Sequence, residues 1–338
     1  MRQLTFVKHG LLEWQDVPEP KLENGREALV RPIVMARCDL DAPILYGIAP
    51  FRGPFPFGHE FIAEVVNVGE AVRSFNIGQR VIVPFQISCG ACLRCQHGLS
   101  NSCQSVPELS HYGLGRESRQ WGGALSDLVR VPYADAMLVA VPDDLDPVAI
   151  ASASDNLPDA WRTVGPYLKT NSDTNVLVVG GSAHSIGLYA VAMAVALGAT
   201  QVDYADSDPE RLRLAEQAGA HVIEGPPPKR VGRYGITVDA SASTEGLACA
   251  LRSTEPGGVC TSVGIYYRDT AVPLLEMYTT GVTFVTGRVN ARETIPHVLD
   301  LVRAGRFKPE QFTTLKARWD DAPEALLTRT TKVVITRE

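Results

Sequence analysis

The chain has 338 residues, with 32 Lys and Arg against 38 Asp and Glu and a formal charge of −6. Its 45% hydrophobic and 21% charged residues are ordinary for a globular protein, which excludes a disordered or fibrous chain, and the length suits about two domains. Because basic residues are not in excess, we expect no binding to nucleic acid.

Residues 1 to about 140 contain short apolar or alternating runs separated by Gly and Pro. This pattern predicts a largely β, barrel-like domain. The N-terminal segment Met1–Trp14 alternates in the same way, so we expect a first strand there and no signal peptide. The other predicted strands are Ala28–Val34, Ile62–Val68, Arg80–Val83 and Leu128–Val131.

From about residue 155 strands alternate with helices, which predicts βαβ units on a parallel sheet. The strands are Asn175–Val179, Gln201–Ala205, Ile236–Asp239 and Val259–Val263, and the helices are Ile186–Leu197 and Pro209–Ala218. The tail predicts helices near Ile295–Ala304 and Asp321–Arg329 and a last strand, Lys332–Ile335, that could close either sheet. The longest apolar runs are shorter than the ~20 residues that span a bilayer, so no membrane helix is expected.

Four cysteines are crowded into one short segment. Cys89, Cys92, Cys95 and Cys103 offer the four soft ligands of a structural zinc site, which leaves no open position for chemistry. Four unrelated buried cysteines or an iron–sulfur cluster are the alternatives. Crowding of this kind without a signal peptide favours metal over disulfides and a reducing compartment, so we expect a cytoplasmic protein.

A second group of potential ligands is spread along the chain. Cys38, His59 with Glu60, and Asp155 each have a simpler interpretation as core residues, but together they suit a catalytic zinc, which takes three protein ligands and keeps one open position. A nearby carboxylate, Glu60 or Asp41, would orient the ligands or exchange with the metal.

The segment VLVVGGSAHSIGLYAV has the strand–turn–helix context of a dinucleotide-binding Rossmann unit. It would place Gly180, Gly181 and Gly187 where a pyrophosphate meets a helix N-terminus. Asp206 follows Gly187 by 19 residues, a spacing suited to accepting from the ribose 2′-hydroxyl and repelling a 2′-phosphate, which favours NAD over NADP. His184 stands where a glycine is usual, and its side chain would either hinder the pyrophosphate or donate to it.

Taken together, these motifs resemble the zinc-dependent medium-chain dehydrogenase family of alcohol, sorbitol and threonine dehydrogenases. The resemblance covers essentially the whole chain and rests on GHEFIAEVVNVGEAVRSFNIGQRV, CGACLRCQHGLSNSC, the VVGG…SIG turn and TKVVI. It implies an α/β protein in which a Rossmann domain with a doubly wound parallel sheet, residues 156–289, is inserted in a largely β, GroES-like catalytic domain, residues 1–155 and 290–338. A zinc lobe would span about residues 86–105.

The resemblance also implies roles for individual residues, including two zinc ions per chain. The catalytic zinc ligands would be Cys38, His59 and Asp155, with Glu60 as an exchangeable or supporting acid, and the structural zinc ligands would be Cys89, Cys92, Cys95 and Cys103. The residues implied in cofactor binding are Gly180, Gly181, His184, Ser185, Ile186, Gly187, Asp206, Arg211 near the adenosine ribose, and Lys332 near the pyrophosphate.

The sequence departs from the family at its proton relay. Relatives read C-x-[ST]-D-x-H after the first zinc cysteine, whereas Leu40 and Pro43 here carry neither the hydroxyl nor the imidazole. Asp39, Asp41, Glu60 or a zinc-bound water would have to carry the proton instead.

We therefore expect hydride transfer between a nicotinamide cofactor and a small alcohol or carbonyl substrate. A biosynthetic carbonyl or iminium reductase of the same fold, or a nucleotide-binding relative with an impaired catalytic site, are the alternatives. Analogy with the family predicts a homodimer or homotetramer, with the segment Asp269–Phe284 as a possible contact.

Overall fold

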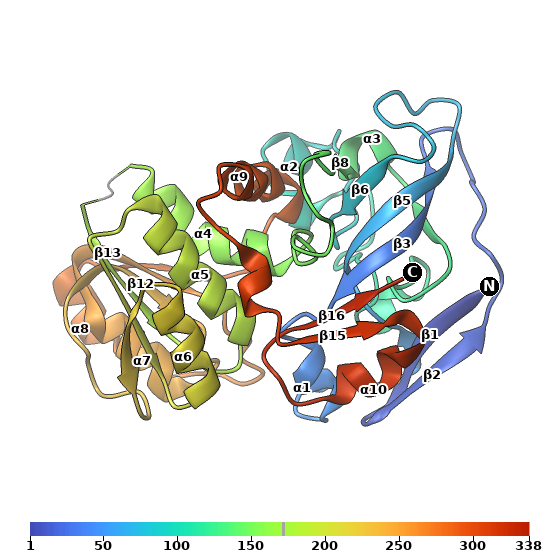
Figure 1. The fold of residues 1–338 in the computed structure, drawn as a ribbon. Coiled ribbons are helices and arrows are strands. Elements are labelled where there is room, and N and C mark those ends of the chain that lie inside the picture. The colour runs from blue at the N-terminus through green and yellow to red at the C-terminus, as the bar shows by residue number, and fades with distance from the viewer. Residues whose placement is uncertain (171–172, 338) are drawn as a thin grey trace. The chain divides into compact units, whose positions relative to one another are not determined.

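The computed structural model describes residues 1–170 and 173–337, and the chain divides into two compact units (Figure 1). The first unit comprises Met1–Pro158, Val289–Arg303 and Thr313–Glu338, and the second comprises Asp159–Arg288 and Ala304–Phe312. Across the described residues, no helix is both long enough and apolar enough to cross a membrane.

The first unit is built on two β-sheets. The larger sheet has the order β15-β16-β3-β5-β6-β8 with β7 paired to β3, and the smaller has the order β2-β1-β4. The strands are β1 (Arg2–Lys8), β2 (Leu11–Asp16), β3 (Ala28–Ala36), β4 (Phe55–Pro56), β5 (Glu60–Val68), β6 (Arg80–Val83), β7 (Val129–Val131), β8 (Val139–Ala140), β15 (Leu315–Arg318) and β16 (Val333–Thr336). The predicted first strand is thus a hairpin of two strands that turns at Gly10, which has φ +72°.

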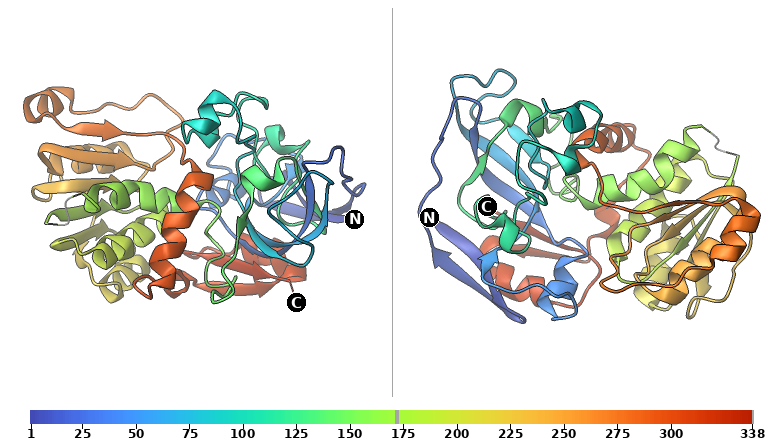
Figure 2. Two further views of the ribbon diagram at one scale, coloured as in Figure 1. Left: turned by 90° about the horizontal axis from the view of Figure 1, so that it is seen from above. Right: turned by 180° about the vertical axis from the view of Figure 1, so that it is seen from behind.

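The C-terminal strand belongs to the sheet of the first unit. β16 pairs antiparallel with β3, and Figure 2 shows these red and blue strands side by side. The helices of this unit are α1 (Asp41–Leu45), α2 (Leu93–Gln96), α3 (Ala134–Met137), α9 (Ala291–Arg303) and α10 (Ala322–Leu327), with 3₁₀ turns at Ser100–Ser102, Arg116–Ser118 and Trp319–Asp321. The pairing places the residues just before β16 beside the end of β3, where Cys38 lies.

An aromatic cluster lies in the core of the first unit. Phe6, Phe55 and Phe57 pack with ring centroids 4.9 to 6.5 Å apart and are almost completely buried. Every second residue of β1 and β5 contributes to this core, namely Leu4, Phe6, Phe61, Ala63 and Val65, and the residues between them are mostly buried as well.

The second unit contains a parallel sheet with the order β11-β10-β9-β12-β13-β14. The strands are β9 (Asn175–Val179), β10 (Gln201–Asp206), β11 (His221–Glu224), β12 (Tyr234–Asp239), β13 (Thr254–Ser262) and β14 (Thr283–Val285). The central strand β9 reads NVLVV and is buried on both faces, the pattern of a parallel strand covered by helices. The order reverses between β9 and β12, which is where ligands bind in open α/β sheets.

Helices cover both faces of this sheet (Figures 1 and 2). α5 (His184–Leu197) and α6 (Pro209–Gln217) pack on each other and on β10, whereas α7 (Thr244–Ser253) and α8 (Leu274–Thr280) pack on β13. α5 ends at Gly198, which has φ +87°, and Asp208 caps α6 by accepting from the Arg211 amide.

The two units differ from the expected domains in the position of one boundary and in the grouping of one segment. The first boundary lies inside α4 (Asn156–Leu168), and residues 304–312, expected with the catalytic domain, group with the second unit. They do so because Phe307 and Phe312, the latter in the 3₁₀ turn Pro309–Phe312, pack edge-on against Tyr189 of α5.

Candidate functional site

Strand pairing brings the distant residues Cys38 and His59 together. β3 and β5 are antiparallel, with Ala36 opposite Glu60, so the chain leaving β3 and the chain entering β5 meet at one end of the sheet. Asp155 joins them because Ser154, its neighbour, accepts from the Phe61 amide at 2.8 Å through its hydroxyl oxygen. We call Cys38, His59 and Asp155 the mixed-ligand cluster.

The ligand atoms of the mixed-ligand cluster lie within 4.8 Å of one another, close enough to hold one metal ion. His59 Nε2 is 3.3 Å from Asp155 Oδ2, and the three residues are at most 7% exposed. One sulfur, one nitrogen and one carboxylate oxygen match the donor set of a zinc site with an open position.

Asp41 contacts two members of the mixed-ligand cluster. Its Oδ2 accepts from the Cys38 amide at 3.0 Å, and its Oδ1 lies 3.7 Å from His59 Nδ1. Within the described part of the chain, both Asp41 Oδ1 and His59 Nδ1 are buried without a hydrogen-bond partner. A carboxylate facing the second imidazole nitrogen directs Nε2 toward a metal, so this pair fits the proposed zinc.

The electrostatics of the cluster favour a bound cation. Burial, together with Asp155 and Asp41, raises the pKa of the Cys38 thiol well above its usual value. Burial alone would lower the pKa of His59, but Asp41 and Asp155 raise it to about 9. Carboxylates that attract a proton to both ligands would attract a metal ion for the same reason.

Glu60 is paired with a buried lysine. Lys332 Nζ lies 2.7 Å from Glu60 Oε2 and donates to the Arg37 carbonyl at 2.9 Å, and both Glu60 and Lys332 are fully buried. Burial raises the pKa of Glu60 to about 7 although Lys332 opposes the shift. The structure therefore places the Lys332 amine against Glu60, and the expected contact with a pyrophosphate stays a prediction.

Sequence reasoning missed Arg37 and Asn156 at this site. The guanidinium of Arg37, 3% exposed, donates to three carbonyls in the segment 326–330, and the Asn156 amide donates to Glu60 Oε1 at 2.9 Å. A basic residue next to Cys38 is the only signal in the sequence for Arg37. Asp39, a predicted proton carrier, is 8% exposed beside Cys38.

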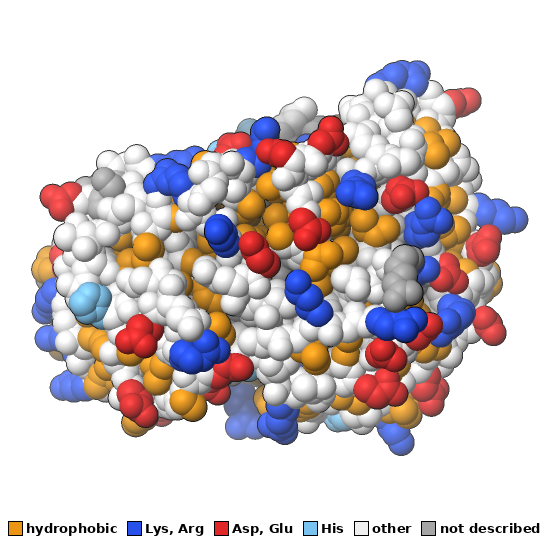
Figure 3. Space-filling model, viewed as in Figure 1, with side chains coloured by type: hydrophobic (Ala, Val, Ile, Leu, Met, Phe, Trp, Pro, Cys, Tyr) orange, Lys and Arg blue, Asp and Glu red, His pale blue; other side chains and the backbone are white. Residues whose placement is uncertain are grey.

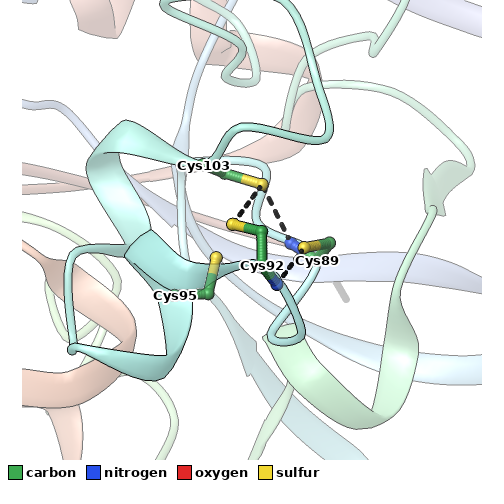
Figure 4. Close-up of side chains that lie close together, drawn as sticks. All are labelled: Cys89, Cys92, Cys95 and Cys103. Atoms are coloured by element: carbon green, nitrogen blue, oxygen red, sulfur yellow. Dashed lines mark hydrogen bonds between the residues drawn. The ribbon is translucent and has the colours of Figure 1, made fainter.

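The four cysteines of the second predicted site also come together (Figure 4). Their sulfurs lie within 4.8 Å of one another, and those of Cys92 and Cys103 are 4.0 Å apart. A tetrahedron with zinc–sulfur bonds of about 2.3 Å requires sulfurs about 3.8 Å apart. The group, which we call the four-cysteine cluster, therefore fits a closed zinc site.

Backbone amides point at the sulfurs of the four-cysteine cluster. Cys89 Sγ accepts from Ala91 and Cys92, and Cys92 Sγ accepts from Gln104 at 3.4 Å. The amides of Gln104 and Cys95 lower the pKa of Cys92 to about 6, and the pKa of Cys89 is lowered too, whereas burial raises the pKa of Cys95 and Cys103. Gly90, with φ +68°, makes the turn possible, and a Cβ there would meet Ala136 at 2.6 Å.

The predicted cofactor turn joins β9 to α5 in the second unit. Gly180 donates to Ala205 at 2.8 Å, and Gly181 has φ +155° and packs against Ser241. α5 begins at His184 and includes Ser185, Ile186 and Gly187 in its first turn, where no acidic residue or side-chain cap neutralises the helix dipole. This positive helix end fits the pyrophosphate of a dinucleotide.

Asp206 ends β10 beside this turn. Its carboxylate accepts from Tyr204 and Arg211 side chains and from the amides of Ser207 and Asp208, at 2.6 to 3.0 Å. Arg211 and Tyr204 lower the pKa of Asp206 although burial opposes this shift. Asp206 is therefore charged and firmly held.

Comparison with known proteins agrees with this geometry. The family model described as "Alcohol dehydrogenase GroES-like domain" matches residues 24–143, and the one described as "Zinc-binding dehydrogenase" matches residues 185–304. The alcohol dehydrogenase of Thermus sp. ATN1 superposes with a TM-score of 0.89 at 28% identity, over 100% of both chains.

Proteins related in sequence are also named as zinc-containing alcohol dehydrogenases. A zinc-type alcohol dehydrogenase B of Aspergillus flavus is 27% identical over 91% of this chain and 74% of its own length. A probable zinc-binding alcohol dehydrogenase of Mycobacterium tuberculosis is 27% identical over 97% and 85%. The chain therefore belongs to the zinc-dependent medium-chain dehydrogenase family and is a zinc-dependent oxidoreductase that uses a nicotinamide cofactor.

Proposed function

We propose that this oxidoreductase transfers a hydride between NAD(H) and a small alcohol or carbonyl substrate, with a catalytic zinc held by Cys38, His59 and Asp155. The observation that carries the proposal is the mixed-ligand cluster itself, with three different ligand atoms within 4.8 Å of one another in a buried site. A zinc ion there would supply Lewis acidity toward the substrate oxygen, and the nicotinamide would accept or donate the hydride.

The surrounding residues hold this site in place and balance its charge. Asp41 orients His59 and accepts from the Cys38 amide, so one carboxylate positions two of the ligands. Lys332 holds Glu60 beside the cluster, where this acid could exchange with a ligand or support the site. A second zinc in the four-cysteine cluster would stabilise the fold and take no part in the reaction.

The preference for NAD(H) over NADP(H) is supported by the charges near Asp206. Arg211 lies 2.7 Å from Asp206 and 3.4 Å from Asp208, so two carboxylates surround one guanidinium. This excess of negative charge would repel a 2′-phosphate and tolerate a 2′-hydroxyl.

The proton must take a route that differs from the family pattern. Asp41 accepts from the Cys38 amide and faces His59, so Asp39, Glu60 or a zinc-bound water would carry the proton. Loss of the relay would weaken alcohol oxidation more than reduction. A strong bias toward carbonyl or iminium reduction would therefore favour the biosynthetic reductase as the second candidate.

We also propose self-association through the edge of the second unit's sheet. β14 is one of the two edge strands, and α8 before it exposes Leu274, Leu275 and Tyr278, which are 68%, 76% and 83% accessible. Apolar side chains that are this exposed commonly mark an interface. Light scattering after gel filtration should show a dimer or tetramer, and a monomer at micromolar concentration would contradict this assembly.

On the face drawn in Figure 3, Lys and Arg side chains are interspersed with Asp and Glu. None of the seven cysteines is in a disulfide, which supports a reducing compartment, and we propose the cytoplasm.

The first experiment is to measure zinc per chain in dialysed protein beside fluorescence titrations with NADH and NADPH. Two zinc ions and tighter binding of NADH support the proposal and justify a screen of alcohols and ketones in both directions. One zinc ion with no binding of either nucleotide would instead favour a relative with an impaired catalytic site.

A further inference from the structure

Tyr204 contacts two separate parts of the predicted nucleotide site. It lies in β10 two residues before Asp206, is fully buried, and donates to Asp206 Oδ2 at 2.6 Å. The same hydroxyl lies 2.4 Å from the position that a Cβ would occupy at Gly180. One hydroxyl therefore packs beneath the glycine turn and also orients the carboxylate expected to meet the ribose.

The carboxylate of Asp206 is held at both oxygens. Oδ2 accepts from Tyr204 and from Arg211 Nε at 2.7 Å, and Oδ1 accepts from Arg211 Nη2 and two backbone amides. The backbone amides hold only Oδ1, so Tyr204 and Arg211 are the donors to Oδ2 among the described residues, and of these two only Tyr204 is fully buried.

We propose that Tyr204 is a positioning residue that holds Asp206 in the orientation that accepts the ribose 2′-hydroxyl, and thereby sets the preference for NAD(H) over NADP(H). This inference rests on the nucleotide binding proposed above. A bond to the 2′-hydroxyl depends on the direction of one carboxylate oxygen, because hydrogen bonds weaken steeply when misaligned. Repulsion of a 2′-phosphate depends on the charges of Asp206 and Asp208, which stay when Tyr204 changes.

The test is the variant Tyr204→Phe, which keeps the ring beneath Gly180 and removes only the hydroxyl. Fluorescence titration should show the Kd for NADH rising about fivefold to tenfold, as for the loss of one ordinary hydrogen bond. The Kd for NADPH should change by less than about twofold, so the selectivity for NADH falls.

Tyr234→Phe is the matched control. Tyr234 donates to the buried carboxylate of Asp203, so this variant also removes one Tyr–Asp bond from the second unit, but at the start of β12. It should lower the melting temperature about as much as Tyr204→Phe does and leave the ratio of the two Kd values unchanged. If Tyr204 had a purely structural role, the ratio of the Kd values for NADH and NADPH would be unchanged in both variants. That result would overturn the proposal.

A double-variant cycle with Asp206→Ala shows whether Tyr204 acts through the carboxylate. In the Asp206→Ala background, Tyr204→Phe should not change the ratio further, and an undiminished effect would overturn the proposed route. Wild-type protein that does not discriminate between NADH and NADPH overturns both this inference and the proposed NAD preference. Discrimination that Tyr204→Phe leaves intact overturns this inference alone.

Discussion

The mixed-ligand cluster and the four-cysteine cluster obtain their charge balance in different ways. In the four-cysteine cluster, partly exposed sulfurs accept from backbone amides such as those of Ala91 and Gln104. In the mixed-ligand cluster, buried carboxylates raise the pKa of Cys38 and His59, and the nearby cation Lys332 is paired with Glu60. The first environment lowers the pKa of Cys89 and Cys92 but raises that of Cys95 and Cys103, whereas the second raises the pKa of both Cys38 and His59, so these two stay protonated until a cation replaces the protons.

The two clusters also differ in how the fold connects them to the rest of the chain. The four-cysteine segment is attached to α9 through Ser100, whose hydroxyl donates to Glu293, and to the residue just before α9 through the Asn101 amide, which donates to Asn290. The mixed-ligand cluster is held by β3, β5 and the start of α4. Damage to the first should therefore affect mainly stability, and damage to the second mainly activity.

The largest effect is expected from Cys38→Ser. Loss of this proposed zinc ligand should reduce kcat/KM by about a thousandfold, since metal assistance contributes several kcal/mol to transition-state stabilisation. Zinc content should fall by one ion per chain, with NADH binding retained. The control Cys92→Ser should also lose one zinc ion but should mainly lower the melting temperature. Full activity of Cys38→Ser would refute the catalytic role of this site.

The next test is the pH dependence of zinc binding by the mixed-ligand cluster. With the pKa of His59 at about 9 and that of Cys38 raised further, zinc must displace protons from both ligands at neutral pH. The apparent affinity of the mixed-ligand cluster for zinc should therefore rise with pH. Because two protons are displaced, the rise is up to about a hundredfold per pH unit below pH 9.

Competition with a chelator at pH 6, 7 and 8 measures how the zinc affinity changes with pH. The variant Cys38→Ser shows which part of the measured affinity belongs to the four-cysteine cluster.

Without metal, the raised pKa of His59 stabilises the fold fully below its unfolded pKa of about 6.5, and this stability is lost as the pH rises through about 9. A zinc affinity that does not vary with pH would contradict the assigned ligands.

A smaller effect is expected from Lys332→Met. Removing the amine leaves Glu60 buried without its cation, which should cost about 3–5 kcal/mol in the free energy of unfolding. The loss should be smaller at pH 5.5 than at pH 8, because Glu60, with a pKa of about 7, is neutral at the lower pH. Urea unfolding at both pH values tests this, with the exposed Lys316→Met on β15 as control. An equal loss in the two variants would exclude a role for the buried pair.

The smallest effects should come from two buried serines. Ser154→Ala removes the acceptor for the Phe61 amide, and Ser100→Ala removes the donor to Glu293. Each should cost about 1–3 kcal/mol of stability, as for a lost buried hydrogen bond. Only Ser154→Ala should also lower kcat several-fold, because Asp155 follows it directly. If Ser100→Ala lowered kcat equally, the functional separation of the clusters would be wrong.

Some elements were predictable because their residues carry strong local signals. The apolar run Asn175–Val179 and the helix that ends at Gly198 were predicted with nearly correct bounds. α4 and α7 were missed, because Pro158, Gly165 and Pro166 interrupt the first and Gly, Ser and Thr weaken the second. Tertiary packing against β9 stabilises α7 despite this weak propensity.

The sequence by itself determined the four-cysteine cluster and the glycine turn, because each is encoded within one short segment whose spacing limits the possible geometry. Only the tertiary structure decided which carboxylates face His59, that Lys332 meets Glu60, and that Tyr204 holds Asp206. Lys332 and Glu60 are 272 residues apart, and only the alignment of β16, β3 and β5 in one sheet brings them together. Local spacing encodes local ligands, whereas strand register decides which distant charges meet.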